Sequence, residues 1–508
     1  MFWADRIVQE IESHFAKASR DKKPLLIRDE KTVSGRVHVG SMRGVAIHGV
    51  VSGALQDAGI KNTFKYELND FDVFDTAPEY LPREFERYIG MLLKDVPSPD
   101  PSAKNFAEYC GKEFQQVITE AGWTPEFYWG SELYLSGKMD GVIREALEHA
   151  PDIRRIYKEV SGSQKEEAWL PVSVVCEKCK KVSTTRAKEF DGALVQYECD
   201  CGHAGKVSPF GGNAKLPWKV EWPGKWKVLG VQVEGAGKDH GTKGGARDVG
   251  NHISREVFNY EPPFDIPYEF FLVGGKKMSS SKGRGSSAKE IADLWPPKIF
   301  RLALLGKDIN QAFNFDPEGD SIPILYDQYD KLAAGYWAGV KDDYARLFEF
   351  IHPGRNIPAK TVLPRFSQVA FIVQMPHMNL RGEFPNTDEA ELNERAKYAK
   401  KWLEQYAPEK YVFKLQEQLP EAAHSLTEIQ KNALAVLADY IEGEQKLSGE
   451  ALHHRLHEIK DEQKISPKEL FSAIYILFLG KSQGPQAGWF LGALPKEFVL
   501  KRLREAIG

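Results

Sequence analysis

Apolar and polar residues alternate over residues 1–70 with spacings that predict helix and strand in turn. Residues 1–20 place apolar side chains at helical spacing and predict an amphipathic helix. The runs PLLIRDE (24–30) and NTFKYELND (62–70) predict buried strands, and apolar residues at helical spacing over 41–58 predict a helix between them. The pattern therefore indicates a β-loop-α-β unit early in the chain.

The middle of the chain returns to this alternation after an irregular stretch. Residues 71–104 are rich in proline and predict a loop, whereas 105–122 and 137–161 predict helices. Between 226 and 273 the run VLGVQVE predicts a strand, ARDVGNHISREVF a helix and EFFLV a second strand, with a glycine-rich turn from Gly235 to Gly245. This order is typical of a doubly wound α/β sheet that is split by an insertion.

From about residue 320 the pattern changes to long amphipathic helices. Glycine and β-branched runs become sparse there, and no cluster of chemically reactive residue types appears. This part of the chain is typical of an all-helical domain used for binding or scaffolding. The helices are expected over 326–350, 388–406, 409–418, 425–443, 447–461 and 467–479.

The bulk composition is that of an ordinary globular protein. The chain has 508 residues, of which 42% are hydrophobic and 28% charged, and a net charge of −4. No apolar run approaches the ~20 residues of a membrane span, and the first residues lack a signal-peptide pattern, so we expect no membrane partner and a cytoplasmic location. The acidic total makes a nucleic-acid partner less expected, although local basic patches such as 395–401 keep that possibility open.

Four cysteines lie close together in the sequence, as two pairs separated by a short β-like segment. Two close thiol pairs match a structural zinc site, which we place in a zinc-ribbon-like module at about 171–210. Because the Cys-x-Cys spacing of the second pair is tighter than usual, His203 is an alternative fourth ligand. The other interpretation is four free or buried thiols. The candidate ligands are Cys176, Cys179, Cys199 and Cys201.

The polar run Lys277-Met278-Ser279-Ser280-Ser281-Lys282-Gly283 predicts a loop that is cationic and rich in hydrogen-bond donors. Such a loop suits a polyphosphate whose charge must be stabilised during a reaction. Taken alone, the run is more often a solvated basic turn. Its interpretation therefore depends on a second phosphate site elsewhere in the chain.

A second phosphate site is predicted in the loop from Thr32 to Ser41, between the first strand and its helix. Gly35 and Gly40 allow the backbone to approach a ligand closely. Gly40 and Ser41 lie where the helix begins, and free N–H groups at that position favour anions. His38 can donate a hydrogen bond to a phosphoryl oxygen, although a histidine near a helix start is more often a structural cap.

Together the two loops resemble the paired signatures of the class I aminoacyl-tRNA synthetases. The residues His38-Val39-Gly40-Ser41 resemble the HIGH motif, and Lys277 to Ser281 resemble the KMSKS motif, each after a predicted strand. Ser280 stands where many members of the family have a lysine. The resemblance therefore assigns the positive charge of the motif to Lys277 and Lys282. The catalytic residues that it implies are His38, Gly40, Ser41, Lys277, Ser279, Ser280 and Lys282.

Further stretches narrow the resemblance to the class I lysyl-tRNA synthetases and extend it over nearly the whole chain. Where members of this group have a glycine that contacts the amino acid, the chain has Glu30. The matching stretches are Asn69-Asp70-Phe71-Asp72, Asn213-x-Lys215-Leu216-x-Trp218, Trp222-Pro223, Gly237-Lys238-Asp239-His240, Tyr268-Glu269-Phe270 and Gly480-Lys481-x-x-Gly484-Pro485-x-x-Gly488.

The resemblance implies that L-lysine is attached to tRNA(Lys) with ATP, through a lysyl-adenylate. It implies ATP with bound Mg²⁺ and a structural Zn²⁺, and we expect a monomer. The implied fold is an α/β doubly wound, Rossmann-type and HUP-like catalytic domain with a zinc-binding insertion, followed by an all-α C-terminal anticodon-binding domain. The expected boundaries are 1–285 for the catalytic domain, about 71–225 for its insertion, 286–325 for a stem-contact and connective region, and 326–508 for the anticodon-binding domain.

A lysine pocket needs an acid for the ammonium group and apolar walls for the methylenes. Glu30 and Glu234 are further candidate acids beside those that follow the second strand, and Trp222 is a further candidate wall. Aromatic residues are about as often core residues, and acids after a strand often belong to a turn. The lysine-binding candidates are Asp70, Asp72, Trp218, His240 and Tyr268, and the ATP or adenylate candidates are Thr32, Ser34, Gly35, Gly235, Gly237, Asp239, His240 and Met278.

Three other functions stay open on the sequence. Another class I synthetase, for glutamate or cysteine, would share both signatures. A non-catalytic tRNA-binding paralogue is expected to have lost His38 or Lys277, and neither is lost. An adenylyltransferase that acts without tRNA has no need of the helical part of the chain.

Overall fold

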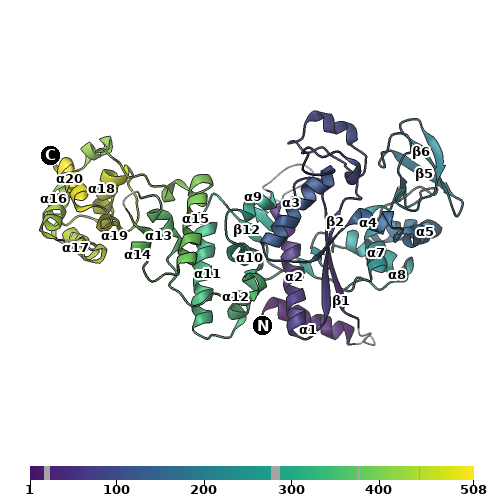
Figure 1. The fold of residues 1–508 in the computed structure, drawn as a ribbon, viewed down its shortest axis with the longest axis horizontal. Helices are drawn as coiled ribbons and strands as arrows, with labels where there is room; N and C mark the ends of the chain where they lie inside the picture. The colour runs from purple at the N-terminus through teal and green to yellow at the C-terminus, as the bar shows by residue number, and fades with distance from the viewer. Residues whose placement is uncertain (17–22, 276–286, 376–377, 446) are drawn as a thin grey trace. The chain divides into compact units, whose positions relative to one another are not determined.

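The computed structural model describes residues 1–16, 23–275, 287–375, 378–445 and 447–508 (Figure 1). These residues form two compact units, Met1–Phe315 with Lys331–Pro358 and Asp316–Asp330 with Ala359–Gly508. Each unit has a buried apolar core of its own. Among the described residues, no helix combines the length and the apolar character needed to cross a membrane.

Parallel strands form the centre of the first unit. β1 (Leu25–Thr32), β2 (Asn62–Asn69) and β3 (Glu126–Trp129) pair in the order β1-β2-β3, with Thr32 opposite Asn69. On the other side of β1, Val233 bridges in parallel to Ile27 and to Phe264. The predicted β-loop-α-β unit is confirmed, and the carboxyl ends of β1 and β2 lie side by side, where doubly wound sheets bind ligands.

Two helices pack against each other beside this sheet, α1 (Trp3–Phe15) and α2 (Met42–Asp57) (Figure 1). The 3-10 turn η1 (Val39–Ser41) leads directly into α2. The apolar residues of α2, among them Val45, Val51 and Leu55, are buried on several sides, so the helix is held in place over most of its circumference. This packing fixes the position of the loop that precedes it.

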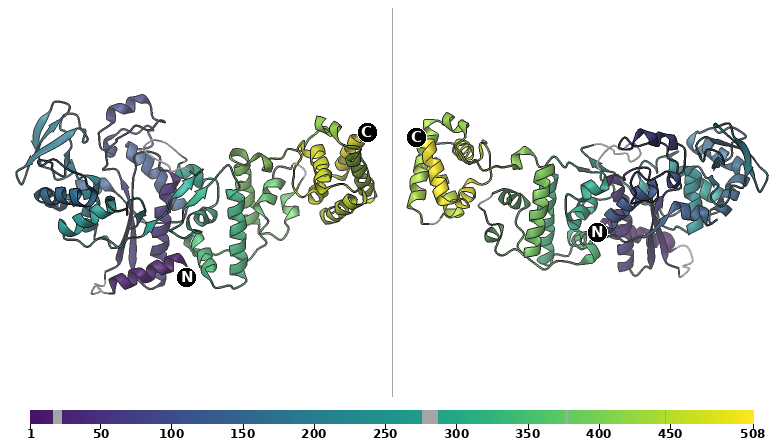
Figure 2. Two further views of the ribbon diagram at one scale, coloured as in Figure 1. Left: turned by 180° about the vertical axis from the view of Figure 1, so that it is seen from behind. Right: turned by 45° about the horizontal axis from the view of Figure 1, so that its top comes forward.

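The chain between β2 and residue 217 forms a mixed part of the first unit. This part contains a small sheet (Figure 2), which shares one buried core with three of its helices. The helical elements are η2 (Arg83–Tyr88), η3 (Leu93–Asp95), α3 (Phe106–Glu120), α4 (Gly130–Leu135), α5 (Asp140–Glu148) and α6 (Ala150–Ser161). The strands are β5 (Thr185–Phe190), β6 (Val195–Cys199) and β7 (Ala204–Val207), which form the small antiparallel sheet, and β4 (Ser173–Val174), which pairs with β8 (Ala214–Lys215).

Two local predictions in the first unit are wrong. The single helix expected over 137–161 is interrupted at His149, because Pro151 in the first turn of α6 has no N–H to continue the hydrogen bonds of α5. The run VLGVQVE (228–234) does not form a continuous strand. Its first two residues belong to α7 (Trp218–Leu229), which ends there because Gly230 has a φ of 73°, a left-handed conformation that favours glycine. The other elements are β9 (Ala236–Gly237), α8 (Ala246–Glu256), β10 (Pro267–Tyr268), β11 (Phe271–Val273), α9 (Ala288–Ala292), α10 (Pro297–Leu305) and β12 (Phe313–Phe315).

Helices dominate the rest of the chain, as the pattern predicts. α15 (Glu389–Gln405), α16 (Glu428–Gly443), α17 (Gly449–Glu462) and α18 (Pro467–Leu479) lie where amphipathic helices are expected. Capping boxes at the starts of α16 and α18 fix two of these boundaries. The elements that the pattern does not predict are η4 (Pro353–Arg355), α13 (Phe366–Ile372), α14 (Leu380–Glu383), η6 (Glu421–Ser425), α19 (Ala487–Gly492) and α20 (Lys496–Ile507).

Two predicted helices in this part are wrong. The helix expected over 326–350 is two helices, α11 (Ser321–Trp337) and α12 (Asp343–Ile351), separated by a turn in which Gly339 has a φ of 81°. The helix expected over 409–418 is only the turn η5 (Glu409–Tyr411). In the latter segment the N–H groups of Phe413 and Gln416 donate to a side chain and to another helix, so no helical ladder forms.

Candidate functional site

A cavity of about 260 Å³ opens at the carboxyl end of β1 in the first unit. Its walls come from β1, from the residues after β2, from α7 and from the segments around β9 and β10. The lining residues are Asp29, Glu30, Lys31, Thr32, Asp72, Trp218, Trp222, Glu234, Gly235, Ala236, Gly237, His240 and Tyr268. The structure thus brings together the predicted residues Thr32, Asp72, Trp218, Gly235, Gly237, His240 and Tyr268.

Arg28 is fully buried behind this cavity and holds three carboxylates. Its Nη1 donates to Glu234 Oε1 at 2.6 Å, and its Nη2 donates to Glu67 Oε2 at 2.5 Å and also to Glu30. Although burial opposes ionisation, Lys225 and Arg28 lower the pKa of the Glu67 carboxyl to about 2. The Glu67 carboxyl is therefore ionised at neutral pH, and Arg28 also holds the carboxylate of Glu30 in place.

Two buried lysines extend the network towards Asp72. Lys225 Nζ lies 2.6 Å from Glu67 Oε1, and Lys215 Nζ lies 2.7 Å from Glu221 Oε2 and 3.5 Å from Asp72 Oδ1. Carboxylates outnumber cations in this connected group, so its charge favours a further cation from outside. The carboxylates are Glu30, Glu67, Asp72, Glu221 and Glu234, and the cations are Arg28, Lys215 and Lys225.

Aromatic rings form one wall of the cavity. Trp218 stacks on Trp222 with ring centroids 5.6 Å apart and an interplanar angle of 9°, and His240 meets Trp218 edge-on at 5.3 Å. The wall is anchored from behind, because the indole N–H groups of Trp222 and Trp226 donate to Glu234 at 3.0 and 2.7 Å. Trp218 remains 38% exposed, so its outer face is open to a ligand.

Asp29 and Tyr268 lie together on the side of the cavity next to α2. Burial raises the pKa of the Asp29 carboxyl to about 6, and His48 Nδ1 lies 3.5 Å from Asp29 Oδ2. Gly44 of α2 has no space for a side chain, since a Cβ there would lie 2.7 Å from both Asp29 Oδ2 and the Tyr268 hydroxyl. Close backbone approach by α2 therefore sets the positions of both side chains.

The predicted phosphate loop leads from this cavity to the start of α2. His38 precedes η1 with extended backbone (φ −74°, ψ 153°), and no side chain caps the start of α2 at Ser41. His38 bridges in antiparallel fashion to Ser287, and Ala288 N donates to Val37 O at 2.7 Å. The His38 loop thus contacts the first described residues after the second predicted loop.

Several predicted residues lie elsewhere or outside the described residues. Asp70 does not line the cavity: it accepts hydrogen bonds from Ser131 N at 2.7 Å and Ser131 Oγ at 2.6 Å. Asp239 lies next to the cavity, with its Oδ1 3.9 Å from His240 Nε2, whereas Ser34 and Gly35 do not line it. The residues outside the described part of the chain are Lys277, Met278, Ser279, Ser280 and Lys282.

Glu30, Asp72 and Glu234 of the charged network are candidate acids on the sequence, but their pairing with buried cations was missed, as was the lining residue Asp29. One signal was available: Arg28 and Glu67 are charged residues in the middle of strands predicted to be buried. A charge in a buried strand needs a partner or a function. The partners themselves are distant in the sequence, as Glu234 is from Arg28.

The four predicted cysteines form a second cluster, away from this cavity in the first unit's small sheet. Their Sγ atoms all lie within 4.8 Å of one another, with 3.7 Å between Cys176 and Cys201 and 3.6 Å between Cys179 and Cys199. These separations are too long for disulfides (about 2.05 Å). His203 is not part of this group, and its Nε2 lies 3.6 Å from Glu177 Oε2. The cluster offers four soft ligands to one metal ion.

Comparisons with known proteins give consistent matches over both units. Residues 1–353 match the family described as "tRNA synthetases class I (K)", and residues 384–507 match the "Anticodon binding domain". The chain is 34% identical to a lysine–tRNA ligase of Methanosarcina acetivorans, over 100% of this chain and 98% of the relative, and 32% identical to one of Thermoplasma acidophilum, over 100% and 99%. A solved glutamate tRNA ligase from Elizabethkingia meningosepticum aligns with 96% of this chain and 99% of its own at 12% identity, with a TM-score of 0.47.

Proposed function

The chain belongs to the class I tRNA synthetases, in the group described as class I (K), and we propose that it attaches L-lysine to tRNA(Lys) with ATP. Relatives named lysine–tRNA ligase align over both units, so the activity concerns the whole chain. A glutamate enzyme is disfavoured on chemical grounds, because the cavity is rich in carboxylates that would repel a second acid.

The observation that carries the proposal is the composition of the cavity. It joins carboxylates in excess of cations to a wall of stacked indoles. A lysine side chain needs both, since its methylenes pack on apolar surface while its ammonium group needs anionic acceptors. We assign the ammonium to Glu30 and Asp72, and the methylenes to Trp218 and Tyr268. Arg28 and Lys215 hold the two acids in place without cancelling the excess of negative charge.

Activation of lysine needs no covalent intermediate with the enzyme. An oxygen of the lysine carboxylate attacks the α-phosphorus of ATP, the bond to the bridging oxygen of the β-phosphate breaks, and pyrophosphate leaves. Catalysis consists of positioning and of stabilising the charge that develops on the phosphates. In this scheme His38 and the start of α2 bind the phosphates, and Lys277 and Lys282 neutralise the leaving pyrophosphate. Mg²⁺ enters with ATP, because it prefers phosphate oxygens to an all-protein site.

Transfer to tRNA follows at the same cavity. The terminal adenosine of the tRNA attacks the activated acyl carbon through its 2′-hydroxyl, as the class I resemblance implies, and AMP leaves. The match of residues 384–507 to anticodon-binding domains supports recognition of the other end of the tRNA by the helical unit. We further propose that the enzyme is a monomer.

Zinc is the metal that best fits the cysteine cluster. In a tetrahedral site with Zn–S bonds of about 2.3 Å, sulfur atoms lie about 3.8 Å apart, close to the 3.6 and 3.7 Å observed. The ligands would be Cys176, Cys179, Cys199 and Cys201. Because Cys176 and Cys179 precede β5 whereas Cys199 ends β6 and Cys201 follows it, a bound ion would join two segments of the chain and stabilise this part of the fold.

Aminoacylation of bulk tRNA with each of the twenty amino acids tests the proposal. We expect lysine alone to be attached. Replacement of Lys277 by alanine should slow lysyl-adenylate formation by roughly 10²- to 10³-fold, the usual effect of losing one transition-state donor, with a much smaller effect on lysine binding. Near-normal turnover of the variant would remove Lys277 from the mechanism, and attachment of another amino acid would overturn the substrate.

A further inference from the structure

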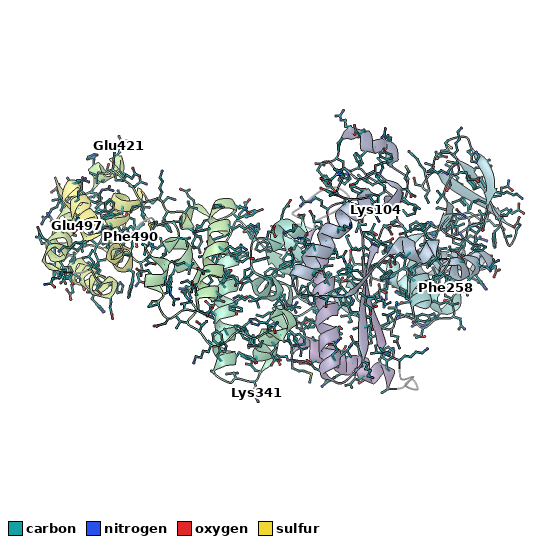
Figure 3. All side chains as sticks on the ribbon, viewed as in Figure 1. Lys104, Phe258, Lys341, Glu421, Phe490 and Glu497 are labelled. Atoms are coloured by element: carbon teal, nitrogen blue, oxygen red, sulfur yellow. The ribbon has the colours of Figure 1, made fainter. Side chains whose placement is uncertain are left out.

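Trp489 is an exposed aromatic residue in the helical unit. It lies in α19 between residues that are buried in the unit's core, such as Phe490 at 1% exposure, yet its own side chain is 50% exposed (Figure 3 labels Phe490). Among the described residues of this unit, it is the only aromatic side chain in the set of large exposed hydrophobic residues. The remaining members of that set are Ile324, Val362, Val412 and Ile429.

Three glycines hold the exposed indole in one position. α19 crosses the start of α17 so closely that a Cβ on Gly449 would lie 2.9 Å from Cδ2 of Trp489. A Cβ on Gly488 would lie 2.6 Å from the Cα of His453, and one on Gly492 would lie 2.7 Å from the N atom of Gly449. Backbone meets backbone at this crossing, so the indole is displayed on a rigid support and little entropy is lost when it binds a partner.

The open face of the indole suits a nucleic-acid base. It packs on the first turn of α17, a helix of 14 residues, where Ser448 accepts a hydrogen bond from Ala451 N and Glu450 places a carboxylate at the positive end of the helix dipole. One turn further along α17, His453 lies with its ring centroid 4.7 Å from that of His457. An exposed ring on such a support can take a base on its open face.

We propose that Trp489 is a stacking platform for one unpaired base of the tRNA anticodon loop. The proposal rests on the proposed function, since it needs tRNA as the partner. Proteins recognise single-stranded loops by stacking splayed bases on aromatic side chains, and the face of a ring accepts any base. The segment that carries Trp489 falls within residues 384–507, which match anticodon-binding domains. A tryptophan that serves only to fill the core would be buried, whereas the ring of Trp489 is exposed to solvent.

The test compares Trp489→Ala and Trp489→Phe in the full-length enzyme. Trp489→Ala should raise the KM for tRNA by roughly 5- to 100-fold, the range for losing one stacked base, with kcat at saturating tRNA unchanged. Trp489→Phe keeps a ring and should retain most of the affinity. Ile429→Ala, which also truncates an exposed apolar residue of this unit, should have no effect.

A second measurement identifies the base. Binding of an anticodon stem-loop RNA is compared with binding of the same RNA carrying one abasic anticodon-loop position at a time. For the base that stacks on Trp489, removal should weaken binding to the wild-type enzyme and have no further effect on Trp489→Ala. If wild-type enzyme charges tRNA with lysine but Trp489→Ala has the same KM, the stacking proposal is overturned while the proposed function stands. If wild-type enzyme charges no tRNA, the proposed function fails first.

Discussion

His48 Nε2 accepts a hydrogen bond from the backbone N–H of Gly235 at 2.8 Å, across the boundary between α2 and the segment that lines the cavity. A backbone N–H can only donate, so Nε2 is unprotonated and the ring proton lies on Nδ1, which donates to Gly44 O at 2.7 Å. Gly235 has no space for a side chain, since a Cβ there would lie 2.9 Å from Ile266 Cβ. A neutral, buried histidine thus positions the segment at Gly235 that lines the cavity.

Replacement of His48 by phenylalanine should destabilise the protein and weaken lysine binding together. The Gly235 N–H would lose its acceptor while still buried, at a cost of about 1–3 kcal/mol in the free energy of unfolding. We expect a lower urea midpoint and a higher KM for lysine. His48→Gln, which offers an acceptor oxygen, should be less affected in both. The control is His252→Phe at an exposed position of α8, and equal effects at both sites would contradict the positioning role.

Asp29 should make stability fall as the pH rises from about 4 to about 6. Its pKa in the folded chain is about 6, above the value near 3.9 of an unfolded chain. The folded chain therefore binds more protons than the unfolded chain in this window, and ionisation of the buried carboxyl costs about 3 kcal/mol at pH 7.

Asp29→Asn removes this titration. Its stability relative to wild type should therefore be greater at pH 7 than at pH 4, as measured by urea unfolding at both values. A difference between variant and wild type that stays constant from pH 4 to pH 7 would show that Asp29 is not the titrating group.

Glu30→Gln and Glu67→Gln make the same chemical change at two places in the charged network, one at the wall of the cavity and one buried behind it. Glu67 is fully buried between Arg28 and Lys225, so its loss should lower the free energy of unfolding by about 3–5 kcal/mol. Glu30 lines the cavity, so its loss should chiefly raise the KM for lysine, by roughly 10- to 100-fold. The pair is checked by urea unfolding and steady-state aminoacylation. A lysine KM that is unchanged in Glu30→Gln would remove this residue from the lysine site.

Removal of one thiol from the cysteine cluster should release the metal. Cys201→Ala leaves three ligands, and we expect metal analysis of the pure protein to find close to one zinc per wild-type chain and far less in the variant. The melting temperature should fall in parallel. Cys110→Ala is the matched control, because Cys110 is a buried thiol outside the cluster and its loss should leave the zinc content unchanged. Wild-type protein without zinc would contradict the assignment.

Local sequence patterns were sufficient to predict a helix or strand where the element is long or strongly periodic. The β1-α2-β2 unit and α18 follow from apolar spacing. The same patterns were insufficient to predict β3, which has only four residues. They were also insufficient for the segment after Pro408, whose N–H groups find partners in other segments. Short elements carry too few residues for a period, and their stability depends on contacts that the pattern does not contain.

The sequence by itself determined the class of fold, the two loops that resemble the synthetase signatures and the four-thiol cluster, because each depends on residue types at short, regular spacings. Only the tertiary structure decided which residues share the cavity and which acids are paired. Arg28 meets Glu67 and Glu234, which lie on β2 and beyond α7, and Asp70 turns away to Ser131 although its neighbour Asp72 lines the cavity. Charges that are buried must find partners in three dimensions, and that choice is made by packing between distant segments.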